Sequence, residues 1–247
     1  MRAWPQGIRF YIALASLLFT AEAYWWTNSV YGGSSTSPIR LQEIFAWTSL
    51  AFLLITVAIG PVCSLVPRLP GKAVLRDARR MLGIGAAWFA SWHVAISYSN
   101  QFHGANPLHL PTLYQRAFAV GLVALLILLA LALTSFDAAF RRLGIWWFRL
   151  HRLIYLSILL VLFHAFNIGV HASSWPFIIS LTVVVGLIFG AQLWLGFGPG
   201  REPTILRSIV LCYGLLITIG IFAYGYTQHA GYSSDDNLNT GSNYESR

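Results

Sequence analysis

The sequence has few charged residues, and acidic residues are the scarcest among them. Charged side chains make up 10% of the 247 residues, with 8 Asp and Glu against 16 Lys and Arg. Soluble domains carry roughly a quarter of charged residues, so this composition, with 57% hydrophobic residues, excludes a soluble globular protein. The formal net charge of +8 would suggest nucleic acid in a soluble protein. Here it predicts a protein of the lipid bilayer with no nucleic-acid partner.

The sequence also lacks most motifs that carry catalysis. It contains no Ser/His/Asp set, carboxylate pair, glycine-rich phosphate loop, Walker motif or CxxC pair, which excludes most hydrolases, nucleotide enzymes and thiol oxidoreductases. The two cysteines, Cys63 and Cys212, lie within apolar segments. We interpret them as buried small hydrophobic residues rather than a disulfide or metal ligands.

Long apolar segments, in contrast, are abundant. Each is close to the length of about 20 residues that a transmembrane helix requires, and the unbroken apolar run 122–133 excludes the alternating pattern of membrane strands. We therefore predict an all-α, polytopic membrane bundle of about seven transmembrane helices. The predicted spans are 8–27, 41–66, 81–99, 113–134, 146–168, 175–197 and 204–226. They leave no room for a soluble nucleotide-binding domain.

The positive residues predict the orientation of this bundle. Thirteen of the 16 lie on one side of the predicted spans: Arg2, Arg9, Arg68, Lys72, Arg76, Arg79, Arg80, Arg141, Arg142, Arg149, Arg152, Arg201 and Arg207. The other side holds Arg40, Arg116 and Arg247. Because short cytoplasmic loops are rich in Lys and Arg, we expect a cytoplasmic N-terminus and a C-terminus outside.

The ends of the chain suggest a division into regions. We expect a first helix and outer loop at 1–40, a main helix bundle at 41–197, an additional helix at 198–226 and a polar, disordered tail at 227–247. The basic start, apolar run and Ala21-Glu22-Ala23 also resemble a signal peptide. The aromatic residues 24–26 favour a retained helix instead, since such residues gather at membrane interfaces.

Three histidines, His93, His151 and His164, lie within apolar segments. Ionisable residues at membrane depth are costly and therefore point to function. Neutral imidazole is a good iron ligand, and a haem can be held by one histidine from each of two helices. His151 and His164 are 13 residues apart on one predicted helix, about 19.5 Å along its axis. This spacing suits two stacked haems, one near each membrane face. We expect the remaining histidines to be solvated loop or tail residues: His103, His109, His171 and His229.

The geometry of this ligand set allows two arrangements. On an ideal helix His151 and His164 point about 140° apart, so tilt or a π-bulge must compensate. Two haems need four histidines, and at the expected fourth position, 14 residues before His93, stands Arg79, a residue type that ligates iron poorly. If this offset of 14 residues sets the depth in the membrane, His93 pairs with His164 around an outer haem, and His151 faces Arg79 around an inner one. If instead the Leu-Gly pairs 82–83 and 143–144 are level, His93 is closer in depth to His151.

Arginines near the haems could bind propionate groups through charge-assisted hydrogen bonds. Arg116, at the outer end of the fourth predicted helix, is the candidate for an outer haem, and Arg149 and Arg152 are candidates for an inner one. The last two could equally extend to the lipid headgroups.

Several motifs occur together and in order in this chain. They are Arg79-Arg80-Met81-Leu82-Gly83, Trp92-His93, Leu131-Ala132-Leu133-Thr134-Ser135, Arg142-Leu143-Gly144, and Leu150-His151-Arg152-Leu153-Ile154-Tyr155 followed by His164. Over about residues 40–195 the chain resembles the ferric reductase-like transmembrane family, in particular its short bacterial haem-binding subunits. The resemblance implies b-type haem ligated by His93, His151 and His164, with Arg79 where longer relatives carry a fourth histidine. The seventh predicted helix departs from the six spans expected of the short members.

The resemblance also implies a function. We expect an electron-transfer subunit of a larger oxidoreductase system in the bacterial inner membrane. It would pass electrons from a quinol or a cytoplasmic flavoprotein to an extracytoplasmic redox protein, with one or two haems and with quinone or FMN as further cofactors. Alternatives are a quinol-oxidising enzyme in its own right and a haem-free transporter or assembly scaffold. Transporters often have broken helices around a polar midplane site, whereas the midplanes here are apolar, which favours the redox function.

Overall fold

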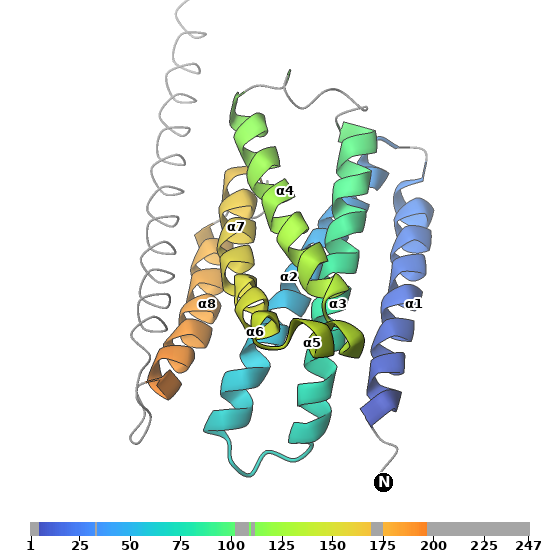
Figure 1. The fold of residues 1–247 in the computed structure, drawn as a ribbon. Helices are drawn as coiled ribbons and strands as arrows, with labels where there is room; N and C mark the ends of the chain where they lie inside the picture. The colour runs from blue at the N-terminus through green and yellow to red at the C-terminus, as the bar shows by residue number, and fades with distance from the viewer. Residues whose placement is uncertain (1–4, 33, 102–108, 110–111, 169–174, 197–247) are drawn as a thin grey trace, which may run out of the picture. The chain divides into compact units, whose positions relative to one another are not determined.

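A computed structural model describes residues 5–32, 34–101, 109, 112–168 and 175–196. Within these ranges the chain is helical and has no β-strand, which confirms the all-α class. The elements are α1 (Pro5–Tyr31), α2 (Thr36–Leu65), α3 (Lys72–Ile96), the π-helical turn η1 (Ser97–Gln101), α4 (Thr112–Leu133), α5 (Asp137–Leu143), α6 (Ile145–His151), α7 (Leu153–Ile168) and α8 (Trp175–Gly196) (Figure 1).

Six predicted spans correspond to described helices, while the span 204–226 and the tail 227–247 lie outside the described residues. In the part of the chain that the structure describes, three stretches are long and apolar enough to cross a membrane: Thr36–Leu65, Gln115–Leu133 and Ile145–Asn167. A shorter apolar helix covers Ile178–Gln192. The chain is therefore a membrane protein with several spanning helices.

The chain divides into two compact units, Met1–Val161 and Leu162–Arg247. The first unit contains α1 to α6 and most of α7. The second contains the end of α7 and α8 among its described residues. In α8 the buried residues Ile178, Leu181, Val185 and Phe189 recur every three or four positions and so form one helix face.

The core of the first unit lies between the antiparallel helices α2 and α3. Gly85, Ala86 and Ala87 are small, which lets the two backbones approach closely. The Ser49 hydroxyl of α2 donates a hydrogen bond to the Ala86 carbonyl of α3 at 2.8 Å. Nearby, the buried Phe89 ring packs 5.8 Å from the ring of Phe45. These contacts set the register of the two helices.

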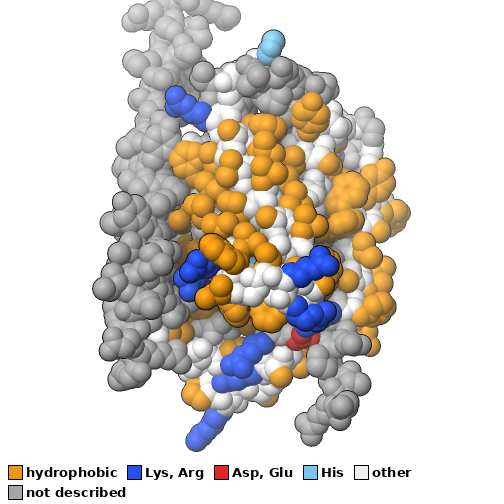
Figure 2. Space-filling view, in the orientation of Figure 1, with side chains coloured by type: hydrophobic (Ala, Val, Ile, Leu, Met, Phe, Trp, Pro, Cys, Tyr) orange, Lys and Arg blue, Asp and Glu red, His pale blue; other side chains and the backbone are white. Residues whose placement is uncertain are grey.

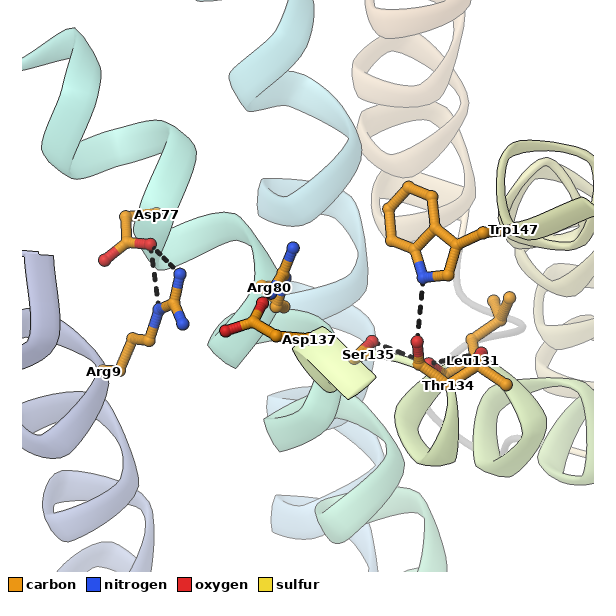
Figure 3. Close-up of polar contacts among 8 residues, drawn as sticks. All are labelled: Arg9, Asp77, Arg80, Leu131, Thr134, Ser135, Asp137 and Trp147. Carbon is orange, nitrogen blue, oxygen red and sulfur yellow. Dashed lines mark hydrogen bonds and ion pairs between the residues drawn. The ribbon is translucent and has the colours of Figure 1, made fainter. Parts of the chain in front are cut away.

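Helix α3 also anchors its other neighbours at one end of the unit. Arg9 of α1 forms an ion pair with Asp77 of α3, with 2.9 Å between Nε and Oδ1. Arg80 of α3 forms another with Asp137 of α5 (Figure 3). The starts of α1 and α3 and the short helix α5 therefore share one end of the first unit.

The positive residues gather at this end. In Figure 2 the Lys and Arg side chains lie mostly around and below α5 and α6, while hydrophobic side chains cover much of the face above them. Arg40 lies near the start of α2 and Arg116 near the start of α4, at the other end of the first unit. The described Lys and Arg residues are therefore divided unequally between the two ends of the first unit.

The fifth predicted span is not one continuous helix. Helix α6 ends at His151 and α7 begins at Leu153, and at the turn the Arg152 amide donates to the Arg149 carbonyl at 3.3 Å. Before α6, Gly144 adopts φ 51° and ψ −120° and separates it from α5, a helix that the sequence pattern did not predict. The interruption lies just after His151, and Arg152 keeps helical dihedral angles there, with φ −71° and ψ −19°.

Candidate functional site

His93 lies in the last turn of α3 and faces α2. Its Nδ1 atom is 3.0 Å from the backbone carbonyl oxygen of Gln42. A carbonyl can only accept, so Nδ1 carries the proton and the lone pair of the neutral ring is on Nε2. Metal-ligating histidines usually have this arrangement, in which the other ring nitrogen donates to a carbonyl or carboxylate.

The polar surroundings of His93 are built by Gln42 and the π-helical turn. Gln42 is buried, with 7% of its surface exposed. Its side-chain Oε1 accepts a hydrogen bond from the Ser97 hydroxyl at 2.8 Å. The Gln42 residue thus contacts both His93 and the residue that follows α3, and it fixes the position of this end of the helix.

His151 is held at the other end of the first unit by Trp147 and Thr134. Its ring stacks on the indole of Trp147, with 3.9 Å between ring centroids and 23° between planes. Its Nε2 atom is 3.2 Å from the Thr134 hydroxyl. The Trp147 indole N–H donates to the Thr134 carbonyl at 2.8 Å (Figure 3). The three residues therefore connect the end of α4 to α6.

A cavity of about 440 Å³ lies beside His151. Its polar lining includes Arg76, Arg79 and Arg80 of α3, and Arg152 between α6 and α7. Among the described residues that line it there is no Asp or Glu. Apolar walls come from α2, α4, α6 and α7: Leu53, Leu128, Leu131, Ala132, Trp147, Phe148 and Ile154. The cavity can therefore accept a largely apolar ligand that carries negative groups.

The depths of His93 and His151 differ. Arg79 lines the cavity with His151. His93 follows Arg79 by 14 residues on the uninterrupted helix α3, about 21 Å along its axis. The structure thus places His151 at the level of Arg79, and not at that of His93.

Other residues predicted to belong to the site are more scattered. Arg116 is exposed in the first turns of α4. Arg149 lies over the ring of Trp146, 4.6 Å from its centroid. His164 belongs to the part of α7 in the second unit. Within the described ranges no group of three or more His, Cys, Asp or Glu residues could hold a metal ion.

The sequence pattern did not indicate three residues that the structure places in the site: Gln42, Thr134 and Trp147. Trp147 lies four residues before His151, a spacing that brings side chains together on a helix. This spacing could have revealed the stacked pair. The role of Gln42 rests on its backbone carbonyl, which leaves no signal in the sequence. Of the two cysteines, Cys63 is buried and free as expected, and Cys212 lies outside the described residues.

Comparison with known proteins identifies the family. A family model described as "Ferric reductase like transmembrane component" matches residues 44–162. The Xanthomonas euvesicatoria protein named protein-methionine-sulfoxide reductase heme-binding subunit MsrQ is 40% identical over 155 residues, which cover 62% of this chain and 69% of that protein. The protein of the same name from Salmonella paratyphi B is 34% identical over 155 residues, which cover 61% of this chain and 74% of that protein. No solved structure matches. The chain therefore belongs to the ferric reductase-like transmembrane family, among the MsrQ-type subunits.

Proposed function

We propose that this protein is a membrane haem b protein that passes electrons across the bilayer, as a subunit of a larger oxidoreductase system. The observation that carries the proposal is the hydrogen bond from His93 Nδ1 to the Gln42 carbonyl. It leaves the lone pair of the neutral imidazole on Nε2, the arrangement that suits iron. The relatives whose names include "heme-binding subunit" support the same cofactor.

His93 and His164 are the residues that we propose to hold an outer haem, with Arg116 available for its propionates. His93 fits this role through its tautomer and its fixed position on α3. We assign His164 as a ligand from the sequence resemblance. Bound haem would supply a centre that gains and loses one electron, and the protein would hold it, orient it and limit its contact with water.

The cavity beside His151 is the proposed site of a second, inner haem. A volume of about 440 Å³ lies within the range of ligand pockets, roughly 300–1,000 Å³. Its arginines, Arg76, Arg79 and Arg152 among them, suit the carboxylates of a haem. Arg79 faces this space where a second ligand would be expected, and because arginine is a poor iron ligand we assign it to charge pairing. The His151 ring in this structure directs Nε2 to Thr134, so ligation through Nε2 requires the ring to leave that hydroxyl.

We further propose the direction of electron flow and the partners. The basic end of the first unit would face the cytoplasm by the positive-inside rule, with the N-terminus inside and the C-terminus outside. A quinol or a cytoplasmic flavoprotein would then donate electrons near His151, and quinone or FMN could be held there. An extracytoplasmic redox protein would accept electrons near His93. The names of the relatives, as subunits of a methionine-sulfoxide reductase, favour an acceptor of this class.

The test is a dithionite-reduced minus oxidised visible spectrum of the detergent-purified protein, with haem quantified per chain as the pyridine haemochrome. A b-type α-band establishes haem binding, and the stoichiometry distinguishes one centre from two. A blank spectrum from protein expressed with ample haem would overturn the proposal in favour of a transporter or an assembly scaffold.

A further inference from the structure

The contacts of Thr134 determine which nitrogen of His151 carries the proton. A threonine hydroxyl has one proton to donate. The Thr134 Oγ1 atom lies 2.7 Å from the Ala130 carbonyl oxygen, which can only accept. The hydroxyl proton is therefore directed to Ala130, and Thr134 Oγ1 accepts a hydrogen bond from His151 Nε2–H at 3.2 Å. The lone pair of the neutral ring is then on Nδ1, the reverse of the arrangement at His93.

The ring is also restrained on its face. Trp147 stacks on it at 3.9 Å between centroids, and the indole is itself fixed by its hydrogen bond to the Thr134 carbonyl. Thr134 thus holds the edge of the imidazole through its hydroxyl and holds the stacked indole through its backbone. Trp147 and His151 are one helical turn apart on α6, so both stay on the same side of that helix.

We propose that Thr134 and Trp147 are positioning residues that latch His151 in an orientation in which Nε2 is engaged, so that ligation of iron through Nε2 requires this latch to open. The inference rests on the proposed function, because it requires His151 to be a haem ligand. The Thr134 hydroxyl and iron compete for the same nitrogen of His151. The inner site should therefore bind haem less tightly than it would without this hydrogen bond.

Substitutions at Thr134 test the competition directly. Thr134→Val removes the hydroxyl at nearly constant shape, and we expect the His151-dependent haem to bind about three- to tenfold more tightly, in line with the loss of one competing hydrogen bond. Thr134→Ser keeps the hydroxyl and should retain the affinity of the unaltered protein. The measurement is an absorbance titration of haem into detergent-purified, haem-depleted protein, with and without His151→Ala in the same background.

Two adjacent tryptophans provide a matched control. Trp147→Phe removes the indole N–H and should also tighten binding of the His151-dependent haem. Trp146 is 63% exposed, so Trp146→Phe should leave the affinity unchanged. Weaker binding in Thr134→Val, or equal effects of the two tryptophan substitutions, would overturn the proposal.

A measurement without haem separates this inference from the proposed function. ¹⁵N spectra of histidine-labelled, haem-depleted protein should show His151, identified by its loss in His151→Ala, as the Nε2–H tautomer. Thr134→Val should reduce the population of that tautomer. A His151 ring that has the Nδ1–H tautomer overturns the latch even if haem binds. If the tautomer is as expected but His151→Ala retains all haem, the ligand role in the proposed function fails, and with it the effect of the latch on haem.

Discussion

The Nδ1 atom of His93 on α3 and the backbone carbonyl oxygen of Gln42 on α2 are 3.0 Å apart. This hydrogen bond joins two helices at one end of the first unit and determines the tautomer of the histidine. Because its acceptor belongs to the backbone, substitution of the Gln42 side chain does not remove it. The side chain has a separate role, since its Oε1 accepts from Ser97.

If His93 and His164 hold the outer haem, removal of either imidazole should abolish the signal of that haem. We expect His93→Ala and His164→Ala each to lose it in reduced-minus-oxidised spectra, with a matching fall in haem per chain. His103→Ala, in the segment between α3 and α4, serves as the control and should keep the full signal. An unchanged spectrum in both ligand variants would refute the ligand assignment.

The close approach of α2 and α3 at Gly85 predicts a steric effect. A Cβ atom at this position would lie 2.7 Å from Cδ2 of Phe52, whose ring packs edge-on against Phe89 at 5.5 Å. Gly85→Ala should therefore destabilise the first unit by about 1–3 kcal/mol through overpacking. Thermal unfolding in detergent would measure the effect.

Gly83 provides the matched control on the same helix. Its added Cβ would meet Thr56 Cγ2 at 3.8 Å, an ordinary contact. Gly83→Ala should be neutral or stabilising by up to about 1 kcal/mol, since alanine favours the helix. Equal melting temperatures for the two variants would contradict the close packing at Gly85.

The break between α5 and α6 predicts a backbone effect at Gly144. Its φ of 51° and ψ of −120° suit glycine, while nothing lies within 4 Å of an added Cβ. Gly144→Ala should therefore cost about 1–3 kcal/mol from backbone strain alone. At Gly71, with φ 73° and ψ 16°, Gly71→Asn should cost less, because asparagine tolerates the left-handed region. Chemical or thermal unfolding of both variants would decide whether Gly144 is the more demanding position.

The ion pair between Asp137 and Arg80 predicts a dependence on acid. The Arg80 guanidinium, through its hydrogen bond and its charge, holds the pKa of the Asp137 carboxyl below the ordinary value of 3.8. A lowered carboxyl pKa means that the stabilisation is complete above the ordinary value and is lost as the pH falls through the lower, folded-state value. Asp137→Asn should therefore flatten the acid side of the stability profile.

Melting temperatures of the unaltered protein and Asp137→Asn, recorded from about pH 6 to about pH 2, would test this dependence. The Asp137 side chain is 61% exposed, so added salt should shrink the difference between the two proteins. A difference that persists unchanged at the lowest pH would show that the carboxylate charge is not responsible.

The class of this protein and most of its helices could be predicted from the sequence. Apolar runs of membrane length and scarce charge are local properties, and they require helices in a bilayer because every backbone polar group must be satisfied within its own segment. The candidate histidines were also visible, since an ionisable residue in such a run is conspicuous. The contact between Trp147 and His151 could also have been predicted, because their spacing is that of one helical turn.

The contacts between residues far apart in the sequence could not be predicted in this way and follow from how the helices pack. Arg79 and His151 line one cavity although 72 positions separate them in the sequence, and the His93–Gln42 contact joins residues 51 positions apart. The interruption at Arg152 likewise lies within a stretch for which the sequence predicts one continuous helix. The pattern of apolar residues indicates which side chains are removed from water. The register of two packed helices depends instead on the shapes of both contacting helix surfaces. The tautomers of His93 and His151 follow from that register, because each is set by an acceptor on another element.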